Sequence, residues 1–338
     1  MKEIISDITP LDFQWKTYDP FLFCAHHYDK YPEGNEIQGP NASLKNRSLG
    51  RDFTLKDGWR MYHGQQIPGF PVHPHRGFET ITIVLEGFVD HSDSMKAGGR
   101  YGEGDVQWMT AGKGMQHSEM FPCIYKNKSN TLHLFQVWLN LPKRNKFVEP
   151  DYKMLWSEDI PVYEETDETG NSICIKIIAG AYNGIKSLSP PTNSWANDPN
   201  NNVNILIIKL SPGAKWSLDE TNINTIRTLY YYKGNGLNIC DKDISVNNSF
   251  KIKQDKNIII ENKDEESFLL FLQGNPINEP IAQHGPFVMN TQEEITQAFK
   301  DYQETEFGGW PWNSPEPVHS EKDIRFAQFS DGRIEKRN

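Results

Sequence analysis

Two pairs of potential metal ligands share the same spacing: His73 with His75, and His117 with Glu119. On a β-strand, residues i and i+2 project from the same face, so each pair would direct both side chains toward one pocket. Neutral imidazole nitrogens and a carboxylate oxygen suit a borderline divalent cation such as Fe(II), Mn(II), Ni(II), Cu(II) or Zn(II). The spacing therefore predicts one mononuclear metal site.

The alternatives at these positions are ordinary core histidines and a structural zinc site. A single histidine is more often a hydrogen-bonded core residue than a ligand, whereas two same-face pairs favour a ligand set. Closed zinc sites usually contain thiolates, and the four cysteines of this chain are dispersed with no CxxC pair. An octahedral iron would instead leave two positions open for a substrate or O2.

The elements that must hold these residues are short strands. Runs rich in Thr, Ile, Val and aromatic residues at 80–85, 104–109 and 132–139 are separated by glycine-containing turns, as expected for closely spaced β-strands. Similar runs follow at 172–178, 204–209, 228–232, 257–260 and 267–272. The sequence therefore predicts two successive all-β units, each an antiparallel barrel or sandwich.

One helix is predicted near the C-terminus, over about 291–304. Thr291 and Glu294 have the spacing of a capping box, in which each side chain accepts a backbone N–H of the other residue. The apolar residues behind it recur at i, i+3, i+4 and i+7, and they are Ile295, Ala298, Phe299 and Tyr302. This stripe is expected to pack on a sheet.

The composition excludes several classes of function. The chain has 338 residues, of which 37% are hydrophobic, and a formal net charge of −10. An acidic chain without a basic stripe is poorly suited to bind phosphates, so direct nucleic-acid binding is not expected. Lys143, Arg144 and Lys146 are interpreted as solvated surface or linker. Neither a membrane helix nor a secretory signal is apparent, so a cytoplasmic protein without membrane association is expected.

Longer stretches around the two ligand pairs resemble the pirin family of the cupin superfamily. They are HPHRGFETITIVLEGFVDHSDS at 73–94 and GEGDVQWMTAGKGMQHSEMF at 102–121. The resemblance continues in GNPINEPIAQHGPFVMNTQEEI at 274–295 and DYQETEFGGWPW at 301–312, and it is weakest over 160–265. These motifs are far more specific than a bare His-x-His pair.

This resemblance implies a bicupin, in which two β-barrels pack face to face. Together with the change in composition near 141–159, it places an N-terminal metal-binding cupin barrel at 1–145, a linker at 146–165, and a C-terminal cupin barrel with the helix and tail at 166–338. The resemblance also implies that the C-terminal barrel is metal-free, and the sequence agrees, since the chain after residue 133 contains two histidines and no His-x-His pair.

The resemblance also implies the metal and its ligands. It implies one iron per chain, as Fe(II) or Fe(III), held through His73, His75, His117 and Glu119. The general cupin pattern offers Glu79 as another carboxylate, which would face the pocket on a regular strand unless a bulge at the preceding glycine breaks the register. The pirin pattern favours Glu119 as the ligand and leaves Glu79 as a hydrogen-bonding partner of a ligating imidazole.

Other pocket residues are predicted with less support from the pattern. Phe78, Trp108 and Met109 could form an apolar wall for an aromatic substrate. His91 lies just past a turn, together with Asp90 and Asp93, and is interpreted as part of a solvated loop.

Two hypotheses about function follow from the resemblance. Pirin-family members are reported both as quercetin 2,3-dioxygenases and as nuclear transcriptional cofactors switched by the redox state of iron. The leading hypothesis is an oxidoreductase that cleaves a small flavonol-like substrate with O2 and uses Glu119 as the catalytic base. The alternative is a non-enzymatic, redox-sensing protein that binds a basic protein partner. A monomer is expected, in the cytoplasm or, in a eukaryote, also in the nucleus.

Overall fold

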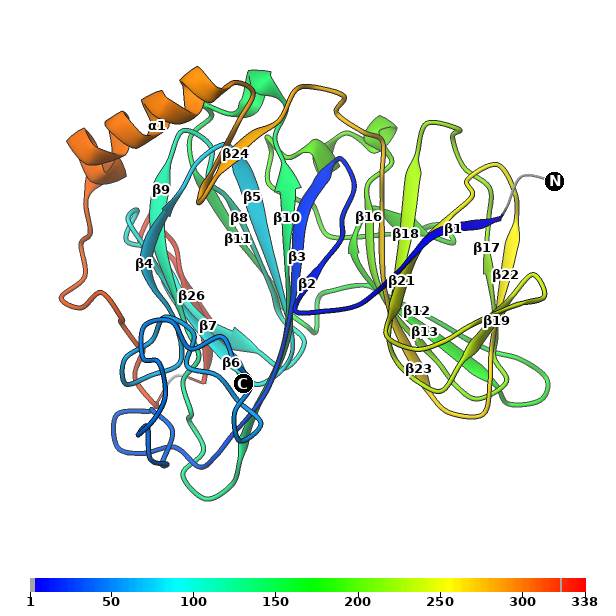
Figure 1. Cartoon of the computed structure of the whole chain (residues 1–338), viewed down its shortest axis with the longest axis horizontal. Coiled ribbons are helices and arrows are strands. Elements are labelled where there is room, and N and C mark those ends of the chain that lie inside the picture. Colours follow the sequence, from blue (N-terminus) through cyan, green and yellow to red (C-terminus); the bar gives the residue numbers. More distant parts are fainter. Residues whose placement is uncertain (1–3, 323) are drawn as a thin grey trace. The chain divides into compact units, whose positions relative to one another are not determined.

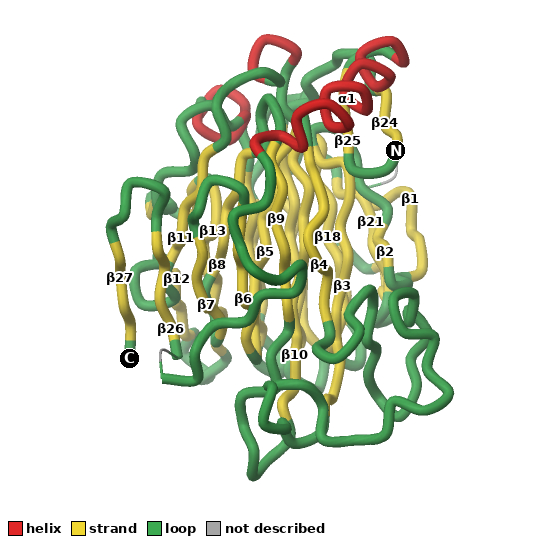
Figure 2. Tube along the Cα trace, turned by 90° about the vertical axis from the view of Figure 1, so that its left-hand side faces the viewer, coloured by secondary structure: helices red, strands yellow, loops and turns green. Residues whose placement is uncertain are grey.

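The computed structural model describes residues 4–322 and 324–338, and strands dominate its regular structure (Figure 1, Figure 2). Contacts divide the chain into two compact units. One unit consists of His26–Ser157 and Glu279–Asn338 and contains both predicted ligand pairs, so it is named the histidine unit. The second unit consists of the segment up to Ala25 and of Glu158–Asn278. The predicted all-β fold class is confirmed.

The units differ from the contiguous domains expected at 1–145 and 166–338, of which residues 1–3 and 323 lie outside the described part. β1 (Ile5–Pro10) pairs with β21 (Asn248–Ile252) in the second unit. The segment that begins at Glu279 belongs to the histidine unit. Both arrangements join parts of the chain that are far apart in sequence, so no local pattern signals them.

Two sheets form the histidine unit. One has the order β11-β8-β5-β10-β3. Its strands are β3 (Phe21–Tyr31), β5 (Phe78–Glu86), β8 (Val106–Thr110), β10 (Asn130–Asn140) and β11 (Asp151–Leu155). The first residues of β3 belong to the second unit, where Cys24 and Ala25 pair with β2 (Gln14–Trp15). The other has the order β27-β26-β7-β6-β9-β4. Its strands are β4 (Gly69–His75), β6 (Phe88–Asp93), β7 (Gly98–Gly102), β9 (Met115–Met120), β26 (Arg325–Gln328) and β27 (Ile334–Arg337).

The second unit contains a seven-stranded sheet, β1-β21-β18-β23-β16-β13-β12, and a four-stranded sheet, β17-β22-β19-β20. One core of isoleucine, leucine and aromatic side chains joins the two sheets. The remaining strands are β12 (Val162–Thr166), β13 (Ser172–Ala179), β14 (Ala181–Tyr182), β15 (Ile185–Lys186), β16 (Asn204–Leu210), β17 (Lys215–Leu218), β18 (Ile226–Lys233), β19 (Leu237–Ile239), β20 (Lys242–Ile244), β22 (Ile258–Asn262) and β23 (Ser267–Gly274).

The predicted helix is α1 (Gln292–Thr305), and its capping box is confirmed. The Glu294 N–H donates to the Thr291 hydroxyl at 3.2 Å, and the Thr291 N–H donates to the Glu294 carboxylate at 3.1 Å. The apolar stripe packs on the hairpin of β24 (Ala282–His284) and β25 (Phe287–Met289). The short 3-10 helices are η1 (Lys143–Asn145), η2 (Trp195–Asn197), η3 (Pro199–Asn201) and η4 (Glu306–Gly308). No described helix has the length and apolar character needed to cross a membrane.

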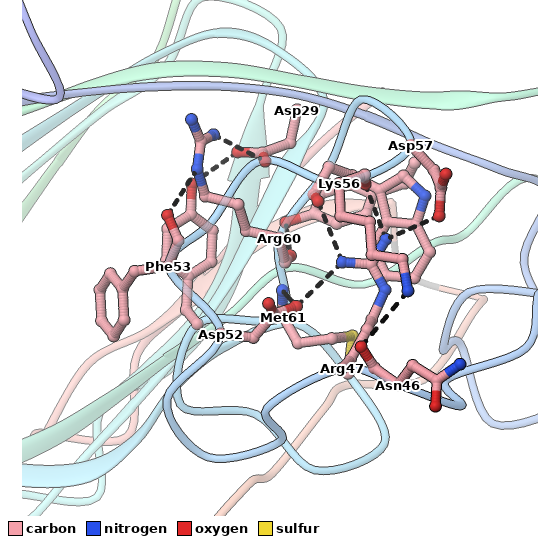
Figure 3. Close-up of polar contacts among 12 residues, drawn as sticks. Asp29, Asn46, Arg47, Asp52, Phe53, Lys56, Asp57, Arg60 and Met61 are labelled. Carbon is pink, nitrogen blue, oxygen red and sulfur yellow. Dashed lines mark hydrogen bonds and ion pairs between the residues drawn. The ribbon is translucent and has the colours of Figure 1, made fainter.

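Two arginines hold the long segment between β3 and β4 (Figure 3). The Arg47 guanidinium donates to the Asp52 carboxylate at 2.9 Å and to the Lys56 carbonyl at 2.8 Å. Arg60 donates at 3.0 Å to the Asp29 carboxylate, which is buried on β3. These contacts anchor the irregular segment to the sheet, so the chain enters β4, the first strand of the candidate site, from a defined position.

Lys146 is buried, in contrast to the solvated position expected from sequence. Its ammonium donates to the Gly77 carbonyl at 2.8 Å, the Asn140 side chain at 2.8 Å and the Val288 carbonyl at 3.0 Å. All three N–H bonds are therefore satisfied, and one side chain joins three separate segments of the histidine unit. The local sequence contains no signal for this role because the acceptors are mainly backbone carbonyls from distant segments.

Replacing Lys146 with methionine is expected to lower the free energy of unfolding by about 3 kcal/mol, because three buried acceptors lose a charged donor. Chemical denaturation of the histidine unit measures this loss. Lys143→Met is the control, since the Lys143 side chain is 66% exposed and its loss should change stability by less than about 0.5 kcal/mol. Equal stability of the two variants would contradict a structural role for Lys146.

Candidate metal centre

The two ligand pairs lie on neighbouring antiparallel strands. β4 and β9 pair so that His73 stands opposite His117, with a bulge in the register between Phe70 and His73. Opposite residues of an antiparallel pair project from the same face of the sheet. The ligand nitrogens of His73, His75 and His117 consequently lie within 4.8 Å of one another. Three ring nitrogens this close together are candidates for the ligands of a single metal ion.

Backbone carbonyls orient two of the three imidazoles. Nδ1 of His73 lies 2.7 Å from the Pro71 carbonyl, and Nδ1 of His75 lies 3.4 Å from the Pro286 carbonyl. Such contacts hold the proton on Nδ1 and leave Nε2 as the donor to a metal. Both ring nitrogens of His117 are buried without a hydrogen-bond partner among the described residues. Since a buried polar atom is rarely left without a partner, His117 fits the role of a metal ligand.

Burial keeps the three imidazoles neutral. Loss of solvent lowers the pKa of His73 to about 4 and lowers the pKa of His75 and of His117 well below the ordinary value. The neighbouring imidazoles lower the pKa of His117 further, because two nearby positive charges repel. A metal requires the unprotonated ring nitrogen, so this part of the site has the protonation state of a ligand set.

Glu119 lies on β9 beside the cluster, and both of its oxygens are held. Thr82 on β5 donates to Oε1 at 3.0 Å, and Gln136 on β10 donates to Oε2 at 2.7 Å. Oε2 lies 3.7 Å from Nε2 of His117. Burial raises the pKa of the Glu119 carboxyl above its ordinary value. The carboxylate is placed to complete a ligand set or to accept a proton from a substrate.

Glu79 has a different environment. It stands opposite Thr110 on β8, whose hydroxyl donates to Oε1 at 2.6 Å. Thr82 lies three positions after Glu79, an odd step, so the two side chains point to opposite faces of β5. Gly77 has a φ of +87°, which interrupts the extended chain between β4 and β5. On a regular strand Glu79, four residues after His75, would face the same side as the histidines. Because the turn at Gly77 interrupts the strand, it does not.

An aromatic wall borders the cluster. The ring centroid of His75 lies 5.0 Å from that of Phe78 and 5.4 Å from that of Trp138. Phe78 and Trp138 themselves are 4.3 Å apart. Trp138 and His73 are half-buried, so this side of the cluster is the one closest to solvent. Sequence reasoning missed Trp138, although its alternation with Gln136 along β10 would have placed both on one face.

The other two predicted pocket residues lie farther from the cluster. Met109 stands opposite Thr80, on the same face as Phe78, and packs against Ala111 and Met115. Trp108 stands opposite Ile81, on the face that also carries Glu79. The structure therefore brings Phe78 to the histidines, places Met109 in the adjacent core and directs Trp108 away.

His91 is buried on β6, which corrects the solvated loop expected from sequence. It stands opposite Glu119, and its ring lies 5.5 Å from that of His117. Nε2 lies 3.1 Å from the Asp93 carboxylate, which also accepts two backbone N–H bonds. Asp90 is buried too, in an ion pair with Arg100. The expectation failed because β6 is an interior strand, and the i, i+2 spacing of His91 and Asp93 was the available signal.

Comparison with known proteins agrees with this geometry. Residues 9–139 match the Pirin family, and residues 205–308 match the Pirin C-terminal cupin domain. The chain belongs to the pirin family. Human pirin is 36% identical over 287 residues, which cover 81% of this chain and 90% of the human protein. The resemblance seen in the sequence is thereby confirmed, as is an all-β fold with two cupin domains.

Bacterial proteins are also similar to this pirin-family chain. A Pseudomonas aeruginosa protein that is named as a proposed quercetin 2,3-dioxygenase is 35% identical over 246 residues, which cover 72% of this chain and 80% of that protein. The crystal structure of quercetin 2,3-dioxygenase from Acinetobacter baumannii aligns with a TM-score of 0.69 at 26% identity, over 90% of this chain and 98% of that chain.

Proposed function

We propose that this pirin-family protein binds one iron ion through His73, His75, His117 and Glu119 and oxidises a flavonol-like substrate with O2. The observation that carries the proposal is the buried cluster of three neutral imidazoles beside an oriented carboxylate. The similarity to proteins named as quercetin 2,3-dioxygenases supports the class of reaction.

The residues of the chain have distinct tasks in this proposal. A bound metal would supply a Lewis acid for the enolic oxygen of the substrate. Glu119 would accept the enol proton, because its carboxylate lies beside the histidine cluster, with Oε2 3.7 Å from Nε2 of His117. Thr82 and Gln136 would keep that carboxylate directed at the cluster. Trp138, which is half-buried, would stack on an aromatic ring of the substrate, and the fully buried Phe78 would pack against Trp138.

Turnover of quercetin tests this function. The iron-loaded protein is expected to consume quercetin under O2 and release carbon monoxide at a rate well above that of the same concentration of free Fe(II). Anaerobic samples and protein stripped of metal are the controls and should show no consumption. A rate equal to that of free iron would contradict the enzymatic function and leave the redox-sensing alternative, for which binding partners of the ferrous and ferric forms should then differ.

A further inference from the structure

The C-terminal helical segment, formed by α1 and η4 over residues 292–308, contacts the chain directly beside two of the proposed metal ligands (Figure 1). Arg76 follows His75 at the end of β4, and Gln116 precedes His117 on β9. Arg76 and Gln116 are both buried, with 6% and 3% of their surface exposed. The helical segment, the ligands and these two residues all belong to the histidine unit.

The Arg76 guanidinium joins the end of β4 to the helical segment. Its Nη1 donates to the Asp301 carboxylate at 2.6 Å, and its Nε donates to the Lys113 carbonyl at 2.6 Å. The guanidinium carbon lies 4.5 Å from the ring centroid of Phe307 in η4. Because a guanidinium is planar, these contacts fix its orientation, and a movement of the residue after His75 would break a charge-assisted contact with α1.

The backbone at the same position is tied to the imidazole of His75. The Arg76 N–H donates to the Pro286 carbonyl at 3.3 Å, and the Val288 N–H donates to the Arg76 carbonyl at 3.0 Å. The same Pro286 carbonyl lies 3.4 Å from Nδ1 of His75. It belongs to the turn of the β24–β25 hairpin, on which α1 packs. The hairpin and α1 thus both contact Arg76, and the hairpin also orients the ligand beside it.

Gln116 makes the second connection. Neighbouring residues of a strand point to opposite faces, so the Gln116 side chain points away from the pocket that His117 faces. Its Oε1 accepts a hydrogen bond from the Tyr302 hydroxyl at 2.9 Å, and its Nε2 donates to the Glu306 carbonyl at 2.7 Å. The helical segment therefore bonds to both the oxygen and the nitrogen of this amide.

The backbone of η4 has an unusual conformation where it meets β9. Glu306 and Phe307 both have a φ of +47°, in the left-handed region that residues with side chains rarely adopt. Such a conformation persists where surrounding contacts hold it. Gly114, just before β9, is so close that an added Cβ would lie 2.8 Å from ring atoms of Phe307. The helical segment is therefore closely fitted to the chain that leads into β9.

We propose that the C-terminal helical segment positions His75 and His117 for metal binding, with Arg76 and Gln116 as the positioning residues. Neither residue is a ligand, but each is adjacent to one in the chain and is held from outside the pocket. Ligands whose positions are fixed before the metal arrives lose less freedom on binding, so the metal is held more tightly. The proposal rests on the metal ligands of the proposed function and is independent of the reaction at the metal.

The rate of Fe(II) loss to an excess of a ferrous chelator tests this role, with the full-length protein loaded under anaerobic conditions. Asp301→Ala removes the ion pair with Arg76 and is expected to lose iron about tenfold faster than the parent, as when a supporting partner of a ligand is removed. Glu304→Ala is the matched control, because it removes a carboxylate from an exposed position of the same helix. It should lose iron at the parent rate.

Tyr302→Phe keeps the test valid if Asp301→Ala does not fold. It removes only the hydroxyl that donates to Gln116, and iron loss about threefold faster than in the parent is expected. Thermal unfolding of the metal-free proteins separates positioning from stabilisation. A contact that only stabilises the fold would lower the unfolding temperature and leave the rate of iron loss unchanged.

Two results would overturn the proposal, and they differ in what they say about the ligands. Iron loss at the parent rate in either folded variant would exclude the positioning role and leave the ligand assignment intact. Failure of the parent protein to bind Fe(II) would contradict the ligand assignment itself, and the positioning role with it.

Discussion

Replacing His117 with alanine is expected to abolish stoichiometric metal binding. His117 is the central imidazole of the cluster, since it stands opposite His73 and its ring lies 4.8 Å from that of His75. Both of its ring nitrogens lack a hydrogen-bond partner among the described residues, so the substitution breaks no side-chain hydrogen bond seen in the described structure. The measurement is elemental analysis of protein reconstituted with Fe(II) under anaerobic conditions and then dialysed. The parent should retain one iron per chain and the variant less than about a tenth of that, as expected when one of few ligands is lost.

His91→Ala is the matched control for this loss. His91 is also a buried histidine beside Glu119, but it is not one of the three imidazoles whose nitrogens converge. The variant should therefore retain its iron, although the loss of the contact with Asp93 can lower stability. Full iron content in His117→Ala, or equal loss of iron in both variants, would contradict the ligand assignment.

Replacing Glu119 with glutamine is expected to reduce quercetin turnover by on the order of 100-fold or more, the usual effect of removing a general base. The amide is nearly the same size but neither accepts a proton nor carries the ligand's charge. Its NH2 group would also face one of the two donors that now hold the carboxylate, Thr82 or Gln136, because each of them bonds to a different oxygen of Glu119. Initial rates with iron content normalised between samples separate a loss of chemistry from a loss of metal.

Glu79→Gln distinguishes the two carboxylates that the sequence left open. Glu79 is fully buried and hydrogen-bonded to Thr110 on the other face of β5. This variant should retain turnover within a few-fold and lose about 1 kcal/mol of stability with the weakened hydrogen bond. If Glu79→Gln were inactive while Glu119→Gln remained active, the roles assigned to the two residues would be reversed.

The repeating elements of this protein could be predicted because their signals are local. The Thr- and Ile-rich run at 80–85 lies within β5 (Phe78–Glu86). Successive side chains of this strand point alternately toward the candidate site and toward the opposite face of the sheet. The capping box of Thr291 and Glu294 begins α1 as predicted. A strand or helix start depends on neighbouring residues, so the sequence contains the information needed to find it.

The assignment of segments to units could not be predicted in this way. β26 pairs with β7, and α1 packs on β25, so the C-terminal segment belongs to the histidine unit rather than to the unit that precedes it in sequence. Lys146 shows the same limit at the level of one side chain, because its acceptors Gly77 and Val288 lie far from it in the chain. Pairings of this kind depend on the tertiary fold and leave no local pattern.

By itself, the sequence determined the type of donors at the candidate metal centre: two same-face pairs that contain three imidazoles and a carboxylate. The tertiary structure decided which neighbours act on them. The turn at Gly77 directs Glu79 away, whereas the register of β6 and β9 brings His91 beside Glu119. Spacing along one strand determines which residues share a face. The pairing of strands that are distant in sequence determines which other side chains lie beside that face.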